Sequence, residues 1–109
     1  NFSLIDSPEM GYKLSPAYDM IASSLVVEGD DEELALALNG KKKKIRKKDF
    51  ISAAKRFNID NKAFENIFDK FRSSLSKWHN FIDISFIPNE MKSSYHDLIN
   101  ERAQRIINY

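Results

Sequence analysis

The sequence of 109 residues contains no cysteine, only three glycines and three prolines, and no long apolar run. The absence of cysteine excludes disulfides, thiolate zinc sites and thiol nucleophiles. The small numbers of glycine and proline favour regular elements over many tight turns. No apolar stretch approaches the roughly 20 residues that a membrane-spanning helix requires. Apolar residues nevertheless make up 42% of the chain, which is too many for a disordered protein.

The length and mass fit one domain, expected to span residues 1–109. A chain of 12.7 kDa can bury roughly two thirds of its unfolded surface, so a self-supporting core is possible. The chain starts at Asn1 rather than Met, and apolar Phe2, Leu4 and Ile5 follow at once. We therefore expect it to begin inside a structural element of a longer protein.

The charges nearly cancel in number but are separated along the chain. Lysine and arginine total 17 and aspartate and glutamate total 16, for a net charge of +1. An acidic run consists of Glu28, Asp30, Asp31, Glu32 and Glu33. A basic run consists of Lys41, Lys42, Lys43, Lys44, Arg46, Lys47 and Lys48. The basic run is interpreted as a solvated turn with its flanks or as a nucleic-acid patch. Because no aromatic residue interrupts it, phosphate binding there would be non-specific and salt-sensitive.

The first 46 residues predict a hairpin followed by extended segments. Residues 2–5 and 12–14 alternate apolar and polar side chains around a loop at 6–11 that contains Pro and Gly. Ser15-Pro16 then predicts the start of a short helix ending near Ser24. A further extended segment, residues 34–38, is expected to end at the Asn39-Gly40 turn.

Residues 47–109 predict a small bundle of three helices, which makes the fold class mainly α. The first helix starts near Lys47 and is interrupted at residues 58–60, where Asp60 can cap the second. The second helix carries a wide apolar stripe and is expected to be buried against two neighbours. Pro88 starts the last helix. The stripe consists of Ala63, Phe64, Ile67, Phe68, Phe71, Leu75 and Trp78.

Few residues could carry chemistry. His79 and His96 have no third group at triad-like spacing, so both are interpreted as helix-surface or boundary histidines. A hairpin brings its ends together, so Asn1 should lie close to the stretch around Asp19. An amide oxygen and a carboxylate are hard ligands that could hold Mg²⁺. On spacing alone, a purely structural role for this pair remains open.

Three blocks of the sequence resemble the C-terminal region of HipA-family serine/threonine kinases, the toxins of type II toxin–antitoxin pairs in bacteria. The blocks are NFSLI at 1–5, YKLSPAYDM at 12–20 and ELALALNGK at 33–41. The later KDF at 48–50 and the Lys77-Trp78 pair also suit the helical tail of the family. The resemblance covers nearly the whole chain and is most specific in the first two blocks.

The resemblance implies a role for each matched residue. Asn1 matches the metal-binding Asn that closes the catalytic loop, and Asp19 matches the Asp that holds Mg²⁺ against the phosphates of ATP. Tyr18 stands where ordinary kinases carry Phe. The catalytic base belongs upstream of Asn1, so no catalytic residue is assigned and this piece alone is expected to be inactive.

The resemblance also implies the wider setting. The chain would form the C-terminal lobe of a kinase-like fold, and the parent would use Mg²⁺ and ATP to phosphorylate a protein Ser or Thr. Its partners would be a HipB-like antitoxin, a protein substrate and DNA contacted through the complex, in the cytoplasm and without a membrane. Two alternatives remain: a basic nucleic-acid-binding module, or an antitoxin-docking helical module with a broad exposed apolar patch.

Overall fold

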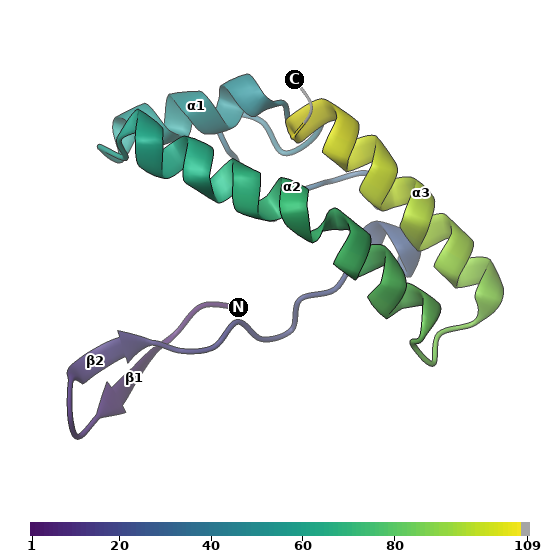
Figure 1. Cartoon of the computed structure of the whole chain (residues 1–109), viewed down its shortest axis with the longest axis horizontal. Coiled ribbons are helices and arrows are strands. Elements are labelled where there is room, and N and C mark those ends of the chain that lie inside the picture. Colours follow the sequence, from purple (N-terminus) through teal and green to yellow (C-terminus); the bar gives the residue numbers. More distant parts are fainter. Residues whose placement is uncertain (108–109) are drawn as a thin grey trace.

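The computed structural model describes residues 1–107. Figure 1 shows an N-terminal hairpin set apart from three helices. In chain order, the elements are β1 (Leu4–Ser7), β2 (Gly11–Leu14), the short 3-10 helix η1 (Ser23–Leu25), α1 (Lys47–Arg56), α2 (Asn61–Asp83) and α3 (Asn89–Ile106). The prediction of a mainly helical fold, with three helices preceded by a hairpin, is confirmed.

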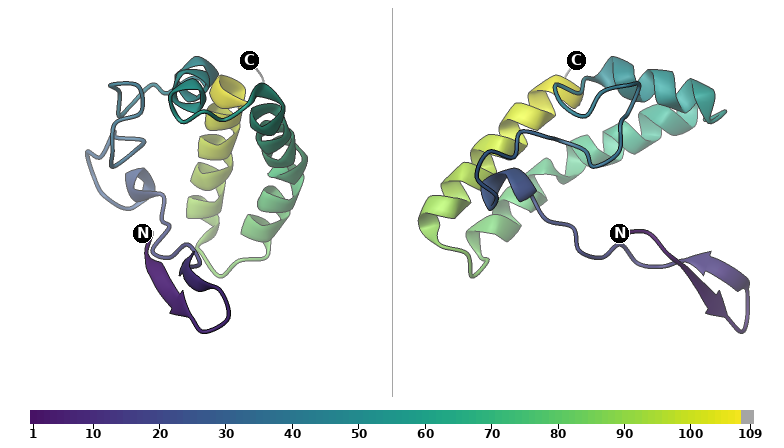
Figure 2. Two further views of the ribbon diagram at one scale, coloured as in Figure 1. Left: turned by 90° about the vertical axis from the view of Figure 1, so that its left-hand side faces the viewer. Right: turned by 180° about the vertical axis from the view of Figure 1, so that it is seen from behind.

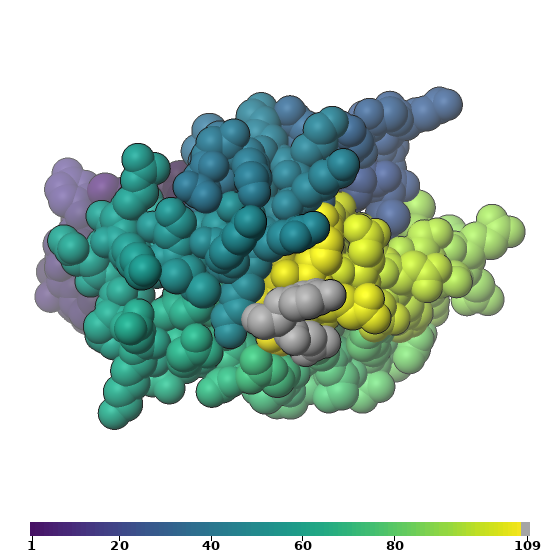
Figure 3. Space-filling model, turned by 90° about the horizontal axis from the view of Figure 1, so that it is seen from above, coloured from purple at the N-terminus to yellow at the C-terminus, as the bar shows by residue number. Residues whose placement is uncertain are grey.

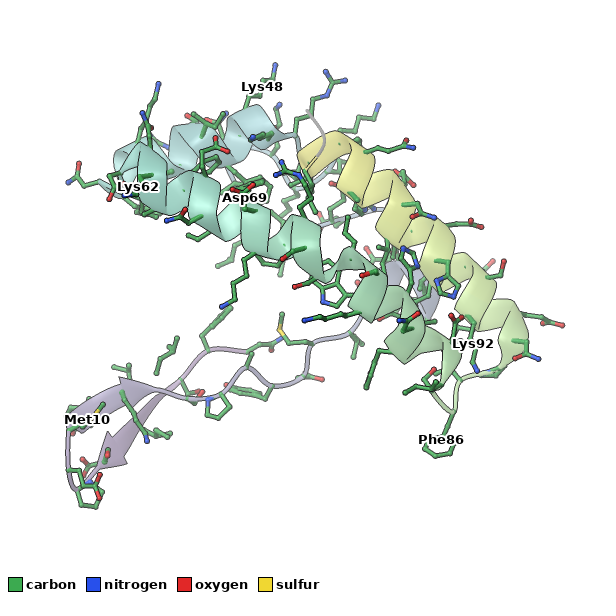
Figure 4. All side chains as sticks on the ribbon, in the orientation of Figure 1. Met10, Lys48, Lys62, Asp69, Phe86 and Lys92 are labelled. Atoms are coloured by element: carbon green, nitrogen blue, oxygen red, sulfur yellow. The ribbon has the colours of Figure 1, made fainter. Side chains whose placement is uncertain are left out.

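The hairpin has a shorter loop than predicted. β1 and β2 pair antiparallel from Leu4↔Leu14 to Ser7↔Gly11, which leaves residues 8–10 as the loop instead of 6–11. The amide of Met10 donates to the carbonyl of Ser7 at 3.2 Å. Gly11 then adopts a φ of 68°, which is the left-handed conformation expected after a three-residue hairpin loop. This tight turn lets the strands extend toward the tip, where Met10 lies (Figure 4).

The predicted helix over residues 15–24 is wrong. Its proposed capping residue, Ser15, instead continues the hairpin, because its amide donates to the carbonyl of Ser3 at 2.7 Å. Its hydroxyl donates to the carbonyl of Pro16 and so does not cap a helix. Asp19 has a φ of 52°, which a right-handed helix cannot contain. Regular structure in this region is limited to η1.

The Asn39-Gly40 turn is confirmed, but no strand leads into it. Asn39 and Gly40 have φ values of 51° and 74°, the pair of positive values that defines a type I′ turn. The turn closes a single bridge, Leu38↔Lys41. Upstream, the amides of Glu33 and Leu34 both donate to the carbonyl of Lys42. Because both amides share one acceptor, residues 33 and 34 form an irregular loop contact with Lys42 and not the regular hydrogen-bond ladder of paired strands.

The helical core forms where α1, α2 and α3 meet. Ala54, Phe64 and Phe68 are buried together, and Phe50, Ile51 and Ile106 pack against them. As predicted, Asp60 caps α2, because its carboxylate accepts from the amide of Ala63 at 2.8 Å. Figure 2 shows α2 and α3 running side by side. None of the helices within residues 1–107 has the length and apolar character needed to cross a bilayer.

The apolar stripe of α2 is covered along only part of its length, contrary to the prediction of burial against two neighbours. Phe64 and Phe68 are buried, but Ile67 and Phe71 are 46% and 48% exposed. Trp78 is half-buried and meets Phe71 edge-on at a centroid distance of 5.7 Å. The stripe is therefore wider than the surface that α1 and α3 cover.

Candidate functional site

The hairpin brings Asn1 to Asp19, as expected from its topology. The side-chain Nδ2 of Asn1 donates to the carbonyl oxygen of Asp19 at 2.8 Å. Beside this bond, the hydroxyls of Ser3 and Tyr18 are 2.7 Å apart. Both contacts extend the pairing of β1 and β2 beyond the strands. A third contact lies beside them, since the amide of Ser15 donates to the carbonyl of Ser3. The segment before β1 and the segment after β2 are thus held together by three hydrogen bonds.

The segments before β1 and after β2 meet at Asn1 and Asp19, and we call this meeting point the crossing. The side-chain oxygens of these two residues suit a hard cation. Because Nδ2 of Asn1 is engaged by Asp19, its Oδ1 is the amide atom left to accept a ligand. Asn1 and Asp19 are both exposed. Amide and carboxylate oxygens fit Mg²⁺, which also keeps several water or phosphate ligands. Within residues 1–107, no group of three or more His, Cys, Asp or Glu side chains is placed to hold a metal ion. A cation bound here would therefore take further ligands from water or from a bound molecule.

The N-terminal arm, residues 1–22, exposes many apolar side chains. The hairpin projects away from the helices in two perpendicular views (Figures 1 and 2). The large side chains exposed by more than a third on this arm are Phe2, Leu4, Ile5, Met10, Tyr12, Leu14, Tyr18, Met20 and Ile21. An apolar surface of this kind is typical of a segment that contacts another protein surface.

The acidic and basic runs pair with each other, which the sequence analysis missed. Four of the seven basic side chains form ion pairs. The pairs are Lys41–Asp49 at 3.1 Å, Lys42–Glu32 at 3.2 Å, Lys43–Asp31 at 2.5 Å and Lys47–Glu65 at 3.5 Å. The hydrogen bond that Lys43 donates to Asp31 raises the pKa of Lys43. Across residues 1–107, Lys44, Arg46 and Lys48 are left without an ion pair, so the nucleic-acid interpretation now depends on them.

Asp49 organises the start of α1 from a fully buried position. Its carboxylate accepts from Nδ2 of Asn39 at 3.0 Å, from Nζ of Lys41 at 3.1 Å and from the amide of Arg46 at 3.0 Å. The bond to Arg46 caps the helix, and the other two fix the 39–41 turn against it. The bond from Asn39, followed by that from Arg46, lowers the pKa of Asp49 to about 2.

We expect this carboxylate to make the fold acid-sensitive. In the unfolded chain Asp49 has an ordinary pKa of 3.8, so the unfolded state binds its proton more readily. The stabilisation is complete above about pH 4 and is lost as the pH falls toward 2. Urea midpoints measured between pH 5 and pH 2.5 should fall less steeply in Asp49→Asn than in the wild type. Equal slopes would contradict the assignment.

Glu33 ties the loop before α1 to the C-terminal part of α3. Its side chain is only 10% exposed and accepts from the amides of Lys44 and Ile45 at 2.9 and 3.0 Å. It also pairs with Arg102 and with Nη2 of Arg105, the latter at 2.9 Å. Figure 3 shows this loop, in blue, lying against the yellow end of α3. Glu33 lies within the ELALALNGK block, but its partner Arg105 lies 72 residues away, so the sequence offered no signal for the two arginines.

His79 and His96 form a second feature that sequence reasoning missed. Interpreted from the sequence as helix-surface or boundary histidines, they approach each other Nδ1 to Nδ1 at 2.5 Å, with ring centroids 4.8 Å apart. His79 lies on α2 and His96 on α3. Only the packing of these helices brings them together, so no local pattern could have indicated the contact.

Comparison with protein families assigns the chain. The sequence model of the HipA-like C-terminal domain family matches residues 1–78, which include Asn1, Asp19, Glu33 and Asp49. The chain therefore belongs to the HipA-like C-terminal domain family, which confirms the resemblance and gives it a toxin–antitoxin context. No curated protein matches the chain.

Proposed function

We propose that the chain provides the metal-binding segment of a HipA-like serine/threonine kinase, within the C-terminal lobe of a kinase-like fold. The parent protein would transfer the γ-phosphate of ATP to a Ser or Thr hydroxyl of a protein. The observation that carries the proposal is the hydrogen bond from Asn1 to Asp19, which brings together the two residues expected, from the resemblance, to bind the metal. Their free oxygens are of the type that Mg²⁺ binds.

The chain's own residues would hold and orient the nucleotide's metal. Asp19 supplies a carboxylate and Asn1 an amide oxygen, while the Ser3–Tyr18 bond fixes the two backbone segments that carry them. When bound, Mg²⁺ neutralises charge on the phosphates during phosphoryl transfer. Most of the work in this reaction is positioning and charge stabilisation, so a rigid crossing is the contribution expected of this segment.

The test is autophosphorylation with ATP and Mg²⁺ by the full-length protein that contains this chain. Asp19→Asn removes the charge yet suits the backbone, since Asn tolerates the left-handed φ of 52° that would strain Ala. We expect a loss of at least about 100-fold, because metal stabilisation of the transition state is worth several kcal/mol. The matched control is Asp6→Asn, which makes the same change at an exposed position of β1.

Comparison of the two variants shows whether a loss of activity comes from the proposed metal ligand or from any loss of charge in the hairpin segment. Asp6→Asn should retain wild-type activity. Full activity in Asp19→Asn would overturn the residue assignment. Equal losses in both variants would attribute the effect to the hairpin's charge or folding, so far-UV circular dichroism is recorded for each. If the wild-type protein is folded but neither binds ATP nor turns it over, the kinase proposal itself fails.

The partners we propose are a protein substrate and a HipB-like antitoxin. The exposed apolar side chains of the N-terminal arm and of α2 support docking of a protein surface, which the alternative of an antitoxin-docking module also requires. The basic run gives weaker support to DNA contact, because four of its seven cations are paired with carboxylates.

A further inference from the structure

Three side chains form a connected chain where α2 ends and α3 runs past it. Nδ1 of His79 and Nδ1 of His96 are 2.5 Å apart. The other ring nitrogen of His96, Nε2, is 2.8 Å from Oδ1 of Asp83. The His96 side chain is 25% exposed and that of Asp83 61%, so solvent reaches the group. Lys92 donates to the carbonyl of Asp83 at 2.7 Å and fastens the end of α2 to α3.

Hydrogen bonding determines which nitrogens can carry a proton. An ionised carboxylate only accepts, so Nε2 of His96 must be the protonated nitrogen that donates to Asp83. In the neutral ring this leaves a lone pair on Nδ1, directed at Nδ1 of His79. Unless Nδ1 of His79 carries a proton, two lone pairs face and repel each other. A proton or a cation must therefore lie between the two rings.

We infer that His79 and His96 bind a borderline transition-metal ion, with Zn²⁺ as the representative, through their two Nδ1 atoms. Imidazole nitrogen suits Zn²⁺, Ni²⁺ and Cu²⁺ and not the hard Mg²⁺ proposed at the hairpin. Asp83 is a positioning residue, because a carboxylate behind a ligating histidine fixes its tautomer and orientation. With two protein ligands, the remaining positions are filled by water, and binding is reversible.

The geometry needs only a small adjustment. Tetrahedral zinc with Zn–N bonds of about 2.0–2.1 Å places two ligand nitrogens roughly 3.3 Å apart. The rings would therefore separate by less than about 1 Å from their spacing of 2.5 Å. The chain contains two histidines in total and no cysteine, so no other imidazole or thiolate can compete for zinc. Zinc binding through imidazole or thiolate must therefore use this pair.

The test measures zinc binding by the untagged chain after treatment with a chelator. Calorimetric titration should give one site. At a free zinc concentration ten times the Kd, the melting temperature should rise by roughly 5 °C. His79→Gln and His96→Gln should each abolish the rise, and Asp83→Asn should weaken binding by about 10- to 100-fold. MgCl₂ at the same concentration should cause no shift.

Nuclear magnetic resonance of the wild-type chain tests zinc binding without any variant. In the wild-type chain, ¹⁵N spectra should show zinc-dependent shifts at Nδ1 of both rings. Shifts at neither ring, no rise in melting temperature, or an equal rise in the glutamine variants would overturn the inference. Unchanged zinc affinity in Asp83→Asn would overturn the role of that carboxylate. All of these readouts are independent of ATP, so failure here is distinguishable from failure of the kinase proposal.

Discussion

Glu33→Gln is expected to lower the free energy of unfolding by about 3–5 kcal/mol, the cost of removing one partner from a buried ion-pair network. The carboxylate accepts from two backbone amides and pairs with Arg102 and Arg105 while only 10% of it is exposed. Glutamine keeps the size of the side chain but loses the charge and presents an NH₂ group to donors. Typical domains have a free energy of unfolding of about 5–15 kcal/mol, so this loss would be a large share of the total stability. Urea unfolding followed at 222 nm measures it.

The matched control is Glu101→Gln. Glu101 also contacts the two arginines, at 3.8 Å from Arg102 and 3.2 Å from Arg105, but its side chain is 62% exposed. Exposed ion pairs contribute about 0–1 kcal/mol, so this variant should unfold close to the wild-type midpoint. If the two glutamine variants shift the midpoint equally, burial of Glu33 is not what makes its network strong.

Phe68→Ala is expected to cost about 3–5 kcal/mol, the range for truncating a buried aromatic residue. Phe68 is 6% exposed at the junction of the three helices. Its ring meets Phe50 edge-on at 5.8 Å and Phe64 at 4.5 Å, and Nζ of Lys47 lies 5.4 Å from its centroid. Truncation removes all three contacts and leaves a cavity between α1 and α2. Urea and thermal unfolding both report the loss.

Phe86→Ala is the control for this change. Phe86 is fully exposed and projects from the turn between α2 and α3 (Figure 4). Removing a side chain that packs against nothing should change the midpoint by less than about 0.5 kcal/mol. A loss at Phe86 comparable to that at Phe68 would mean that the turn has a packing partner in solution.

Where local interactions decide the structure, the sequence predicted it well. The helices follow from the 3.6-residue apolar period, and the start of α2 follows from Asp60, whose cap reaches only to Ala63. The closeness of Asn1 and Asp19 could be predicted for the same reason, because a hairpin needs only neighbouring residues. The family resemblance added what spacing could not, the expectation of a metal-binding role for the pair.

The predictions that were wrong or incomplete concern residues whose contacts lie far away in the sequence. Ser15-Pro16 has the local chemistry of a helix start, but the carbonyl of Ser3 takes the Ser15 amide. The basic run resembles a phosphate-binding patch until the acidic run is seen to lie against it. The contact between His79 and His96 depends on how α2 and α3 pack, and the apolar period of each helix does not fix that arrangement.

The Glu33 network also sets an order of events during synthesis. Arg105 follows Glu33 by 72 residues, so at 5–20 residues per second a ribosome needs roughly 4–14 s to supply it. A hairpin such as β1–β2 can close within about 10 μs of being made. For those seconds the Glu33 carboxylate is without the guanidinium groups that neutralise it. The contact between Asn1 and Asp19 can therefore form in the nascent chain long before the loop that follows is locked onto α3.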